Sequence, residues 1–299
     1  MSQTVAETRR IGDKTLCTEW DIGVNHWAGS VLFMSDQHFD SADCDRALLK
    51  RHLDEALERA APVYMLGDWW DAMGGRNDRR GSKSSLRPEY KRSDYLNALV
   101  EDTVEFLAPY AHLIAGWCRG NHETSILSHT EFDLLSATVQ QLNARTGSEI
   151  QIMPYTGWII FRPYRTCKSK RGDNRRVIDS ICVAYSHGTG GGGPVTKGVI
   201  GTNRRATYLP DADIVISGHI HESWMVELQR ERCTGNGRIY QDTQWHLQLP
   251  SYKDEYKGNS WWVQTGKSPR PKGGWWVDLS VERGNQHGKE VSIQPRRAT

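Results

Sequence analysis

The chain lacks the features that mark secreted and membrane-spanning proteins. Its six cysteines are scattered and form no C-x-x-C pair, which excludes a zinc ribbon and argues against a disulfide framework. No run approaches the roughly 18 apolar residues of a membrane span, and the opening MSQTVAETRRIGDKTLC has no apolar signal core. We therefore expect a cytoplasmic protein that does not contact a membrane.

A large net charge is also missing, because 38 basic residues nearly cancel 36 acidic ones. The basic residues are nevertheless concentrated. Residues 72–92 carry seven Lys and Arg against two acidic residues, and residues 161–176 carry seven against one. Two positive loops of this kind favour a phosphate-rich partner such as nucleic acid, and the alternative is a pair of solvated loops that aid solubility.

Five apolar runs look like buried strands, and each ends at polar residues of catalytic type. They are VLFMSDQH (31–38), PVYMLGD (62–68), HLIAGWCRGNHE (112–123), ICVAYSHG (181–188) and ADIVISGHIH (212–221). Loops at strand ends are free to converge while the strands stay packed. This layout predicts an α/β sheet with function at its C-terminal edge.

Helical periodicity appears between these runs, at residues 41–60, 94–110 and 131–147. Ser41 or Asp43 can cap the first helix, and Gly147 suits the C-terminus of the third. After residue 221 the pattern changes to short alternating runs rich in tryptophan, which predict antiparallel strands. Alternation would place one ring of the pair Trp275-Trp276 in the core and the other on the surface.

The polar residues at the strand ends form one set with a consistent chemistry. They are Asp36, His38, Asp68, Asp71, Asn121, His122, His187, His219 and His221. Imidazole and carboxylate without cysteine suit manganese, with iron, zinc and nickel as alternatives. The set is too large for one ion, so two adjacent divalent ions are the economical hypothesis.

The order D-x-H, G-D-x-x-D, G-N-H-E, H, G-H-x-H resembles the calcineurin-like metallophosphoesterases. The resemblance implies a metallophosphoesterase-type α/β/β/α sandwich with mixed sheets and an antiparallel, Trp-rich C-terminal part. We expect a single catalytic domain over residues 1–299, with a core at about 28–282, a basic insertion at 72–92 and a basic tail at 283–299.

The resemblance also implies a role for each motif residue. By position, Asp36, His38 and His221 would hold the first ion, and Asp68 would bridge to the second. Asn121, His187 and His219 would complete the second site. His122 would protonate the leaving oxygen, and Asp71 would hydrogen-bond to His122 and hold its tautomer.

One departure from the family bears on the substrate. The family's protein phosphatases follow the second aspartate of G-D-x-x-D with arginine and glycine, whereas Ala72 and Met73 follow Asp71 here. This departure argues against a phosphoprotein substrate. The basic insertion at 72–92 is the nearest candidate to meet substrate phosphates, and further candidates are Arg119, Lys197, Arg204 and Arg205. Trp69 and Trp70 would either stack on a base or, as we favour, pack beneath the ligands.

The glycine-rich run SHGTGGGGPVTKG (186–198) imitates a dinucleotide fingerprint, but it comes late in the chain, after three ligand-bearing strands. We interpret it as the loop that follows His187 and lies near a substrate phosphate.

The preferred function is a phosphodiesterase or nuclease that uses a metal-bridging hydroxide. The alternative is a phosphomonoesterase or small-nucleotide pyrophosphohydrolase on the same scaffold. A non-catalytic binding module would show degenerate ligands, and this sequence has none.

Overall fold

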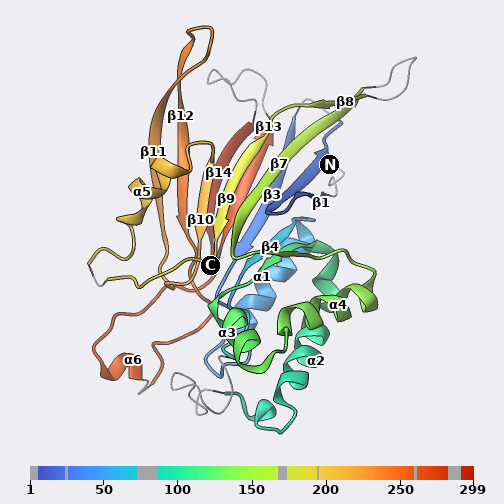
Figure 1. Ribbon diagram of the computed structural model, residues 1–299, viewed down its shortest axis with the longest axis vertical. Coiled ribbons are helices and arrows are strands. Elements are labelled where there is room, and N and C mark those ends of the chain that lie inside the picture. The colour runs from blue at the N-terminus through green and yellow to red at the C-terminus, as the bar shows by residue number, and fades with distance from the viewer. Residues whose placement is uncertain are drawn as a thin grey trace.

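The computed structural model describes residues 6–23, 26–72, 86–167, 174–193, 195–258, 261–281 and 291–299. Two mixed sheets pack face to face, with helices on their outer faces (Figure 1). The expected α/β/β/α sandwich is therefore confirmed. Within the described part of the chain, no helix has the length and apolar character needed to cross a membrane.

The larger sheet, sheet A, has the order β1-β2-β7-β9-β10-β12-β11, with β8 paired to β7. Its strands are β1 (Glu7–Gly12), β2 (Thr15–Asp21), β7 (Thr156–Cys167), β8 (Asn174–Val177), β9 (Ile181–Ser186), β10 (Ile214–Ser217), β11 (Trp224–Cys233) and β12 (Ile239–Gln248). Strands β9, β10 and β12 are parallel, so their C-terminal ends lie at one edge of the sheet.

The smaller sheet, sheet B, has the order β14-β13-β3-β4-β5-β6. Its strands are β3 (Trp27–Met34), β4 (Val63–Leu66), β5 (Ile114–Cys118), β6 (Gln151–Met153), β13 (Gly274–Val281) and β14 (Val291–Ala298). Strands β3 to β6 are parallel, while β13 and β14 are antiparallel, as the alternating pattern near the C-terminus predicts.

The three helices expected from periodicity are present. The helices are α1 (Arg46–Glu58), α2 (Tyr95–Leu107), α3 (Asn121–Thr130), α4 (Leu134–Thr146), α5 (Gly201–Tyr208) and α6 (Trp261–Gln264), with short 3₁₀ helices at Pro88–Tyr90 and Ala108–Leu113. Asp45 caps α1 in place of Ser41 or Asp43, because its carboxylate accepts from the Leu48 amide. Gly147 ends α4 in the left-handed conformation as expected.

Helix α3 was not expected, because the run at 112–123 reads as one strand. That strand ends at Cys118, and the helix begins at Asn121. The G-N-H-E motif therefore lies at a strand-to-helix junction. Its side chains project from the first turn of a helix.

The tryptophan pair of β13 corrects a second expectation. Trp275 and Trp276 are both buried, because β13 lies inside sheet B. Trp275 packs into the core between the two sheets, and Trp276 packs into the core under the helices. Alternation places the rings on opposite faces, but both faces of this sheet are covered.

The C-terminal segment is not a tail over its described length. Residues 291–298 form β14, which pairs with β13 along its whole length, while residues 282–290 lie outside the described residues. Likewise β1 and β2, before the expected start of the core at 28, belong to sheet A.

Candidate metal centre

The motif residues meet where the C-terminal edges of the two sheets come together. Strands β3, β4 and β5 deliver them from sheet B, and β9 and β10 deliver them from sheet A. The loops are cross-linked by main-chain hydrogen bonds. The amide of Asp36 donates to the carbonyl of Gly67 (3.0 Å), and the amide of Gly218 donates to the carbonyl of His187 (2.8 Å).

Three side chains, Asp36, His38 and His221, form what we call the first donor group. One ligand atom from each lies within 4.8 Å of the others. The Nε2 atoms of the two imidazoles are 3.2 Å apart, and His221 Nε2 lies 3.4 Å from Asp36 Oδ1. The geometry therefore suits a shared ion.

Asp68, His187 and His219 form the second donor group by the same criterion. His187 Nδ1 donates to the carbonyl oxygen of Leu66 (2.6 Å), which turns Nε2 toward Asp68 Oδ2 at 3.1 Å. Asn121 Oδ1 lies 3.0 Å from the same Nε2. The structure thus brings together every residue that the resemblance assigns to the second ion.

Backbone strain is concentrated at these residues. Eight described residues other than glycine have positive φ, and five of them are candidate ligands. The five are Asp36, His38, Asp68, His219 and His221. Such conformations cost about 1–3 kcal/mol each and persist where the surroundings over-determine them, which is typical of functional sites.

Two glycines make the convergence of the loops possible. A Cβ on Gly120 would lie 2.0 Å from Asp68 Oδ1, and one on Gly218 would lie 2.1 Å from Ser35 Oγ. The loops after β5 and β10 can approach the aspartates of β3 and β4 only because these positions have no side chain.

His122 and Asp71 are close but do not form the bond that the resemblance implies. Their nearest atoms, His122 Nδ1 and Asp71 Oδ1, are 3.7 Å apart, beyond hydrogen-bond distance. The same Oδ1 lies 3.1 Å from His38 Nδ1. Asp71 is therefore placed to orient His38 of the first donor group more closely than it orients His122.

Sequence reasoning missed two charged residues that follow β12. Lys253 Nζ lies 2.7 Å from Asp71 Oδ2, and Glu255 Oε2 lies 3.5 Å from His221 Nδ1. A carboxylate on the outer nitrogen of a metal-binding imidazole fixes its ring orientation and tautomer. The run SYKDE (251–255) carries these charges directly after a strand, and that is the available sequence signal.

Glu123, the last residue of G-N-H-E, was also left without a role. Its buried carboxylate accepts from the main-chain amides of Asp68 (3.0 Å), Trp69 (2.8 Å) and Gly120 (2.8 Å). One side chain thus ties the loop after β4 to the loop after β5. Glu123 therefore fixes the position of Asp68 relative to Asn121 and His122.

The protonation of two imidazoles fits a centre that binds cations. Burial disfavours the charged form of His187, but the Asp68 carboxylate outweighs burial and raises the pKa to about 10. Burial likewise opposes protonation of His221, and the hydrogen bonds and charges of Asp36 and Glu255 raise its pKa to about 9. These imidazoles therefore occupy the place of a cation and must lose their protons when a metal binds.

A further observation supports the fit. The buried Nδ1 of His219 has no hydrogen-bond partner among the described residues, which is costly unless a ligand satisfies it. Converging oxygen and nitrogen donors of this kind suit borderline to hard divalent ions. The residues present fit two divalent metals.

The four predicted substrate cations have different surroundings. Arg119 is held by Asp133 through two contacts of 2.6 and 2.7 Å, and Lys197 lies 3.5 Å from Glu222. Arg204 is exposed on α5, and Arg205 lines a cavity beside β10. Their substrate role stays a prediction.

Trp69 and Trp70 are fully buried, and both indole N–H groups donate to Thr103 Oγ1. They pack beneath the candidate ligands, as we favoured, and offer no surface for a base.

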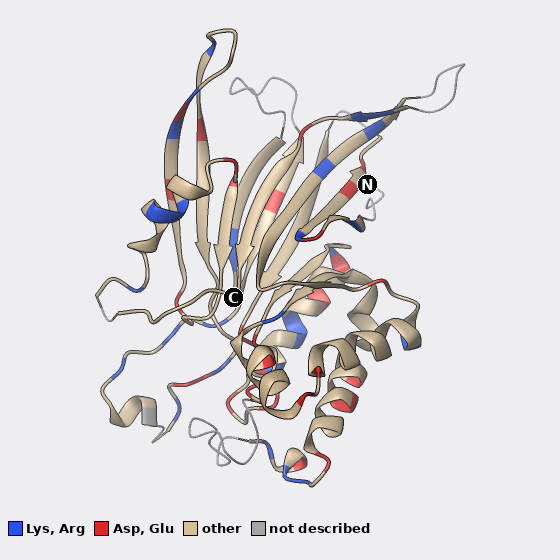
Figure 2. Ribbon diagram, viewed as in Figure 1, with Lys and Arg blue, Asp and Glu red and all other residues tan. Residues whose placement is uncertain are grey.

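The two basic segments are also placed differently. Thr156 of β7 pairs with Ser186 beside His187, whereas Cys167 ends the strand roughly 35 Å away. Arg165, Arg175 and Arg176 therefore lie toward the end of sheet A remote from the donor groups, and Arg162 lies about halfway along β7 (Figure 2). Most of the 72–92 insertion, residues 73–85, lies outside the described residues.

Comparison with known proteins identifies one family. The family model described as calcineurin-like phosphoesterase matches residues 29–223. That range contains every motif residue.

Among solved structures, the chain is similar to Vps29 of Entamoeba histolytica complexed with zinc, at 12% identity and a TM-score of 0.34, covering 90% of this chain and 99% of that one. It is similar to vacuolar protein sorting 29 of Cryptosporidium parvum, at 10% identity and a TM-score of 0.37, covering 91% of this chain and 98% of that one. It is also similar to a predicted phosphoesterase of Streptococcus pneumoniae, at 12% identity and a TM-score of 0.30, covering 90% of this chain and 99% of that one. Scores this low carry no argument about activity. No curated protein matches the sequence.

Proposed function

The chain belongs to the calcineurin-like phosphoesterase family, and on that premise we propose that it is a two-metal phosphoesterase that cleaves phosphodiesters. The observation that carries the proposal is the pairing of the two donor groups at one edge of the sandwich, beside a third set of donors, His38, Asp71 and His122, that shares His38 with the first. In this proposal Asp36, His38 and His221 would hold one ion, Asp68, His187, His219 and Asn121 would hold the other, and Asp68 would be shared between the two.

Two bound divalent ions would supply a nucleophilic hydroxide and withdraw charge from the phosphoryl oxygens. The chain's own residues have separate tasks. His122 is only 9% exposed, and its Nε2 lies 3.6 Å from Asp68 Oδ2. This position suits proton donation to the leaving oxygen at the edge of the donor groups.

Lys253 supplies a fixed positive charge beside Asp71. Its ammonium neutralises Asp71, and its side chain is only 16% exposed. Paired in this way, Asp71 can hold His38 without adding net negative charge that would repel a phosphate ester.

The segment after β12 also supports a diester substrate. Lys267 and Arg270 both lie 4.1 Å from the ring of Trp262, and Arg270 contacts Glu255 (3.5 Å), the partner of His221. Figure 2 shows cationic residues along this segment, on both sides of α6. A basic and aromatic wall of this kind suits a nucleotide chain, and nuclease activity is the form of the proposal that we prefer.

One observation favours the alternative, a phosphomonoesterase or small-nucleotide pyrophosphohydrolase. Most of the described basic residues of 161–176 lie toward the remote end of sheet A, so a long nucleic acid would gain less from them than their charge suggests.

A substrate panel with manganese tests the proposal. Phosphomonoester, chromogenic phosphodiester, cyclic dinucleotide, single- and double-stranded DNA, and RNA are offered to the purified chain. We expect diester cleavage that falls steeply with salt, because many phosphate contacts release many counterions. Hydrolysis of a monoester without any diester would overturn the phosphodiesterase proposal, and a shallow salt dependence would favour the small substrate.

A further inference from the structure

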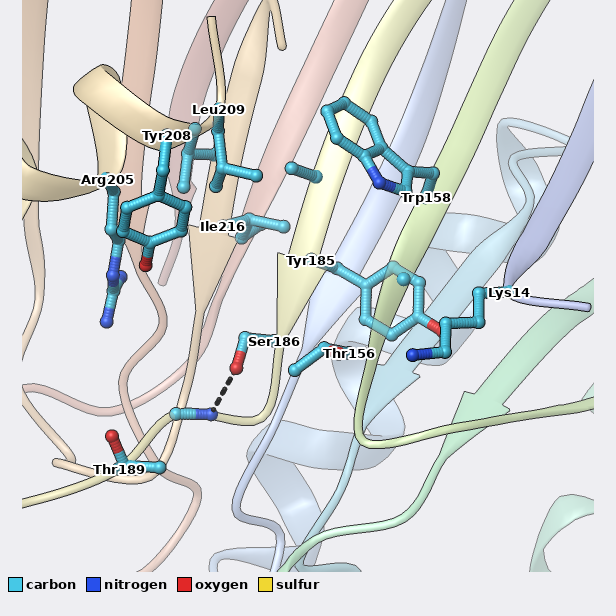
Figure 3. Close-up of a pocket in the computed structure, with 14 residues that line it drawn as sticks. Lys14, Thr156, Trp158, Tyr185, Ser186, Thr189, Arg205, Tyr208, Leu209 and Ile216 are labelled. Carbon is cyan, nitrogen blue, oxygen red and sulfur yellow. Dashed lines mark hydrogen bonds between the residues drawn. The ribbon is translucent and has the colours of Figure 1, made fainter. Parts of the chain in front are cut away.

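A cavity of about 370 Å³ lies on the outer face of sheet A, beside α5 (Figure 3). We propose that it is a binding site for a nucleotide, distinct from the two donor groups. None of its lining residues belongs to either group. The inference goes beyond the proposed function and does not depend on it.

The cavity exists because α5 is only eight residues long and covers part of the sheet. Tyr208, at the end of α5, forms one wall, and Trp158 of β7 forms the other (Figure 3). Tyr208 is 66% exposed. Its ring is available to stack on a planar aromatic group.

The charge of the lining selects an anion. Lys14 and Arg205 are its charged side chains, and the lining contains no Asp or Glu. Figure 3 shows the two cations entering from opposite sides of the cavity. Arg205 Nη1 donates to Ser217 Oγ (2.6 Å), which fixes the guanidinium while its other N–H groups stay available for a phosphate.

Hydroxyl groups complete the polar edge of the cavity. Thr156, Ser186 and Thr189 line it at the end nearest the donor groups. Ser186 Oγ accepts from the Gly188 amide (3.1 Å) and keeps its own proton for a ligand. Aromatic walls, two cations and a row of hydroxyls match the base, phosphate and ribose of a nucleotide.

Gly188 separates this cavity from the metal centre. It lines the cavity, and a Cβ at this position would lie 2.7 Å from the Gly218 carbonyl oxygen and 3.0 Å from His219 Cβ. One layer of backbone thus stands between the cavity and His219. In the proposal the glycine-rich run therefore lies next to a phosphate site, but this site is on the side of the run that faces away from the metal centre.

The test uses the analogue of AMP in which a methylene group replaces the 5′ ester oxygen, so that no phosphoesterase can cleave it. Its affinity for the full-length protein is measured by titration, and contact of its base is detected by saturation-transfer NMR. We expect Tyr208→Ala to weaken binding by roughly 5- to 100-fold through the loss of stacking. The matched control Tyr240→Ala, on β12 outside the cavity, should leave the affinity unchanged.

A second variant tests the anion contact. Lys14→Met should weaken binding of the phosphonate but leave binding of adenosine unchanged, because only the phosphonate is charged. The side chain of Lys14 is exposed, so the change should not affect folding.

Absence of binding to the wild type, or equal binding by wild type and Tyr208→Ala, would overturn the inference. So would binding that is lost in Asp68→Asn, because the probe would then occupy the metal centre. Phosphoesterase activity is assayed in parallel. Its absence would reject the proposed function while leaving this inference intact.

Discussion

The two donor groups are supported by different kinds of chemical group. The first depends on charged side chains, because Asp71 contacts His38 and Glu255 contacts His221. The second depends on a main-chain group, because the carbonyl of Leu66 orients His187. A carbonyl in a strand end is held by the fold, whereas a carboxylate on a loop can be removed by one substitution. The first donor group should therefore be the more easily disturbed.

The largest effect is expected where the two groups meet. Asp68→Asn should remove the proposed bridge, weaken both groups together and lower activity by about 10³-fold or more, since metal assistance contributes several kcal/mol. Activity and metal content of the purified variant measure this. Loss of one ion with the other fully retained would show that Asp68 serves a single group.

His122→Gln should separate chemistry from metal binding. If His122 donates a proton to the leaving oxygen, activity should fall by about 10²- to 10⁴-fold while both donor groups keep their ions. Elemental analysis alongside kinetics provides the measurement. A parallel loss of metal would place His122 among the ligands.

Glu255→Gln directly tests whether the first donor group is more easily disturbed than the second. Removing the charge beside His221 should weaken metal affinity at the first donor group by about 10- to 100-fold and leave the second unchanged. Stepwise metal titration resolves the two affinities. Glu227→Gln, on the exposed part of β11, is the matched control. Equal weakening at both groups would contradict the asymmetry.

The smallest effect concerns pH and involves both groups. The pKa values of His221 (about 9) and His187 (about 10) are raised above the ordinary value of 6.5. Protonation of these imidazoles therefore stabilises the metal-free protein fully below pH 6.5. This stabilisation is lost as the pH rises through 9 and 10. Metal affinity should rise over the same range because fewer protons must be displaced. The difference in Tm between metal-loaded and metal-free protein should therefore widen from pH 6.5 to 9. A constant difference would argue against proton displacement.

Local patterns predict an α/β sheet with the nine motif residues at one edge, and the resemblance to the family implies the sandwich. An apolar strand followed by a polar turn is visible within about ten residues, and parallel strands bring such turns to one edge. Lys253 escaped prediction because its contact with Asp71 joins positions 182 residues apart, one in the connection from β12 to β13 and the other after β4. The burial of both Trp275 and Trp276 likewise depends on β14 taking the edge of sheet B. Contacts between segments so far apart in the chain form only when the sheets assemble, so a local sequence pattern does not show them.

The central claim is that two metals bind in two separate donor groups. Diffraction from manganese-soaked crystals, recorded with the anomalous signal of manganese, tests it most directly. The account predicts two anomalous peaks in each chain, one among Asp36, His38 and His221 and one among Asp68, His187 and His219. A single peak under saturating manganese, or peaks elsewhere, would contradict it.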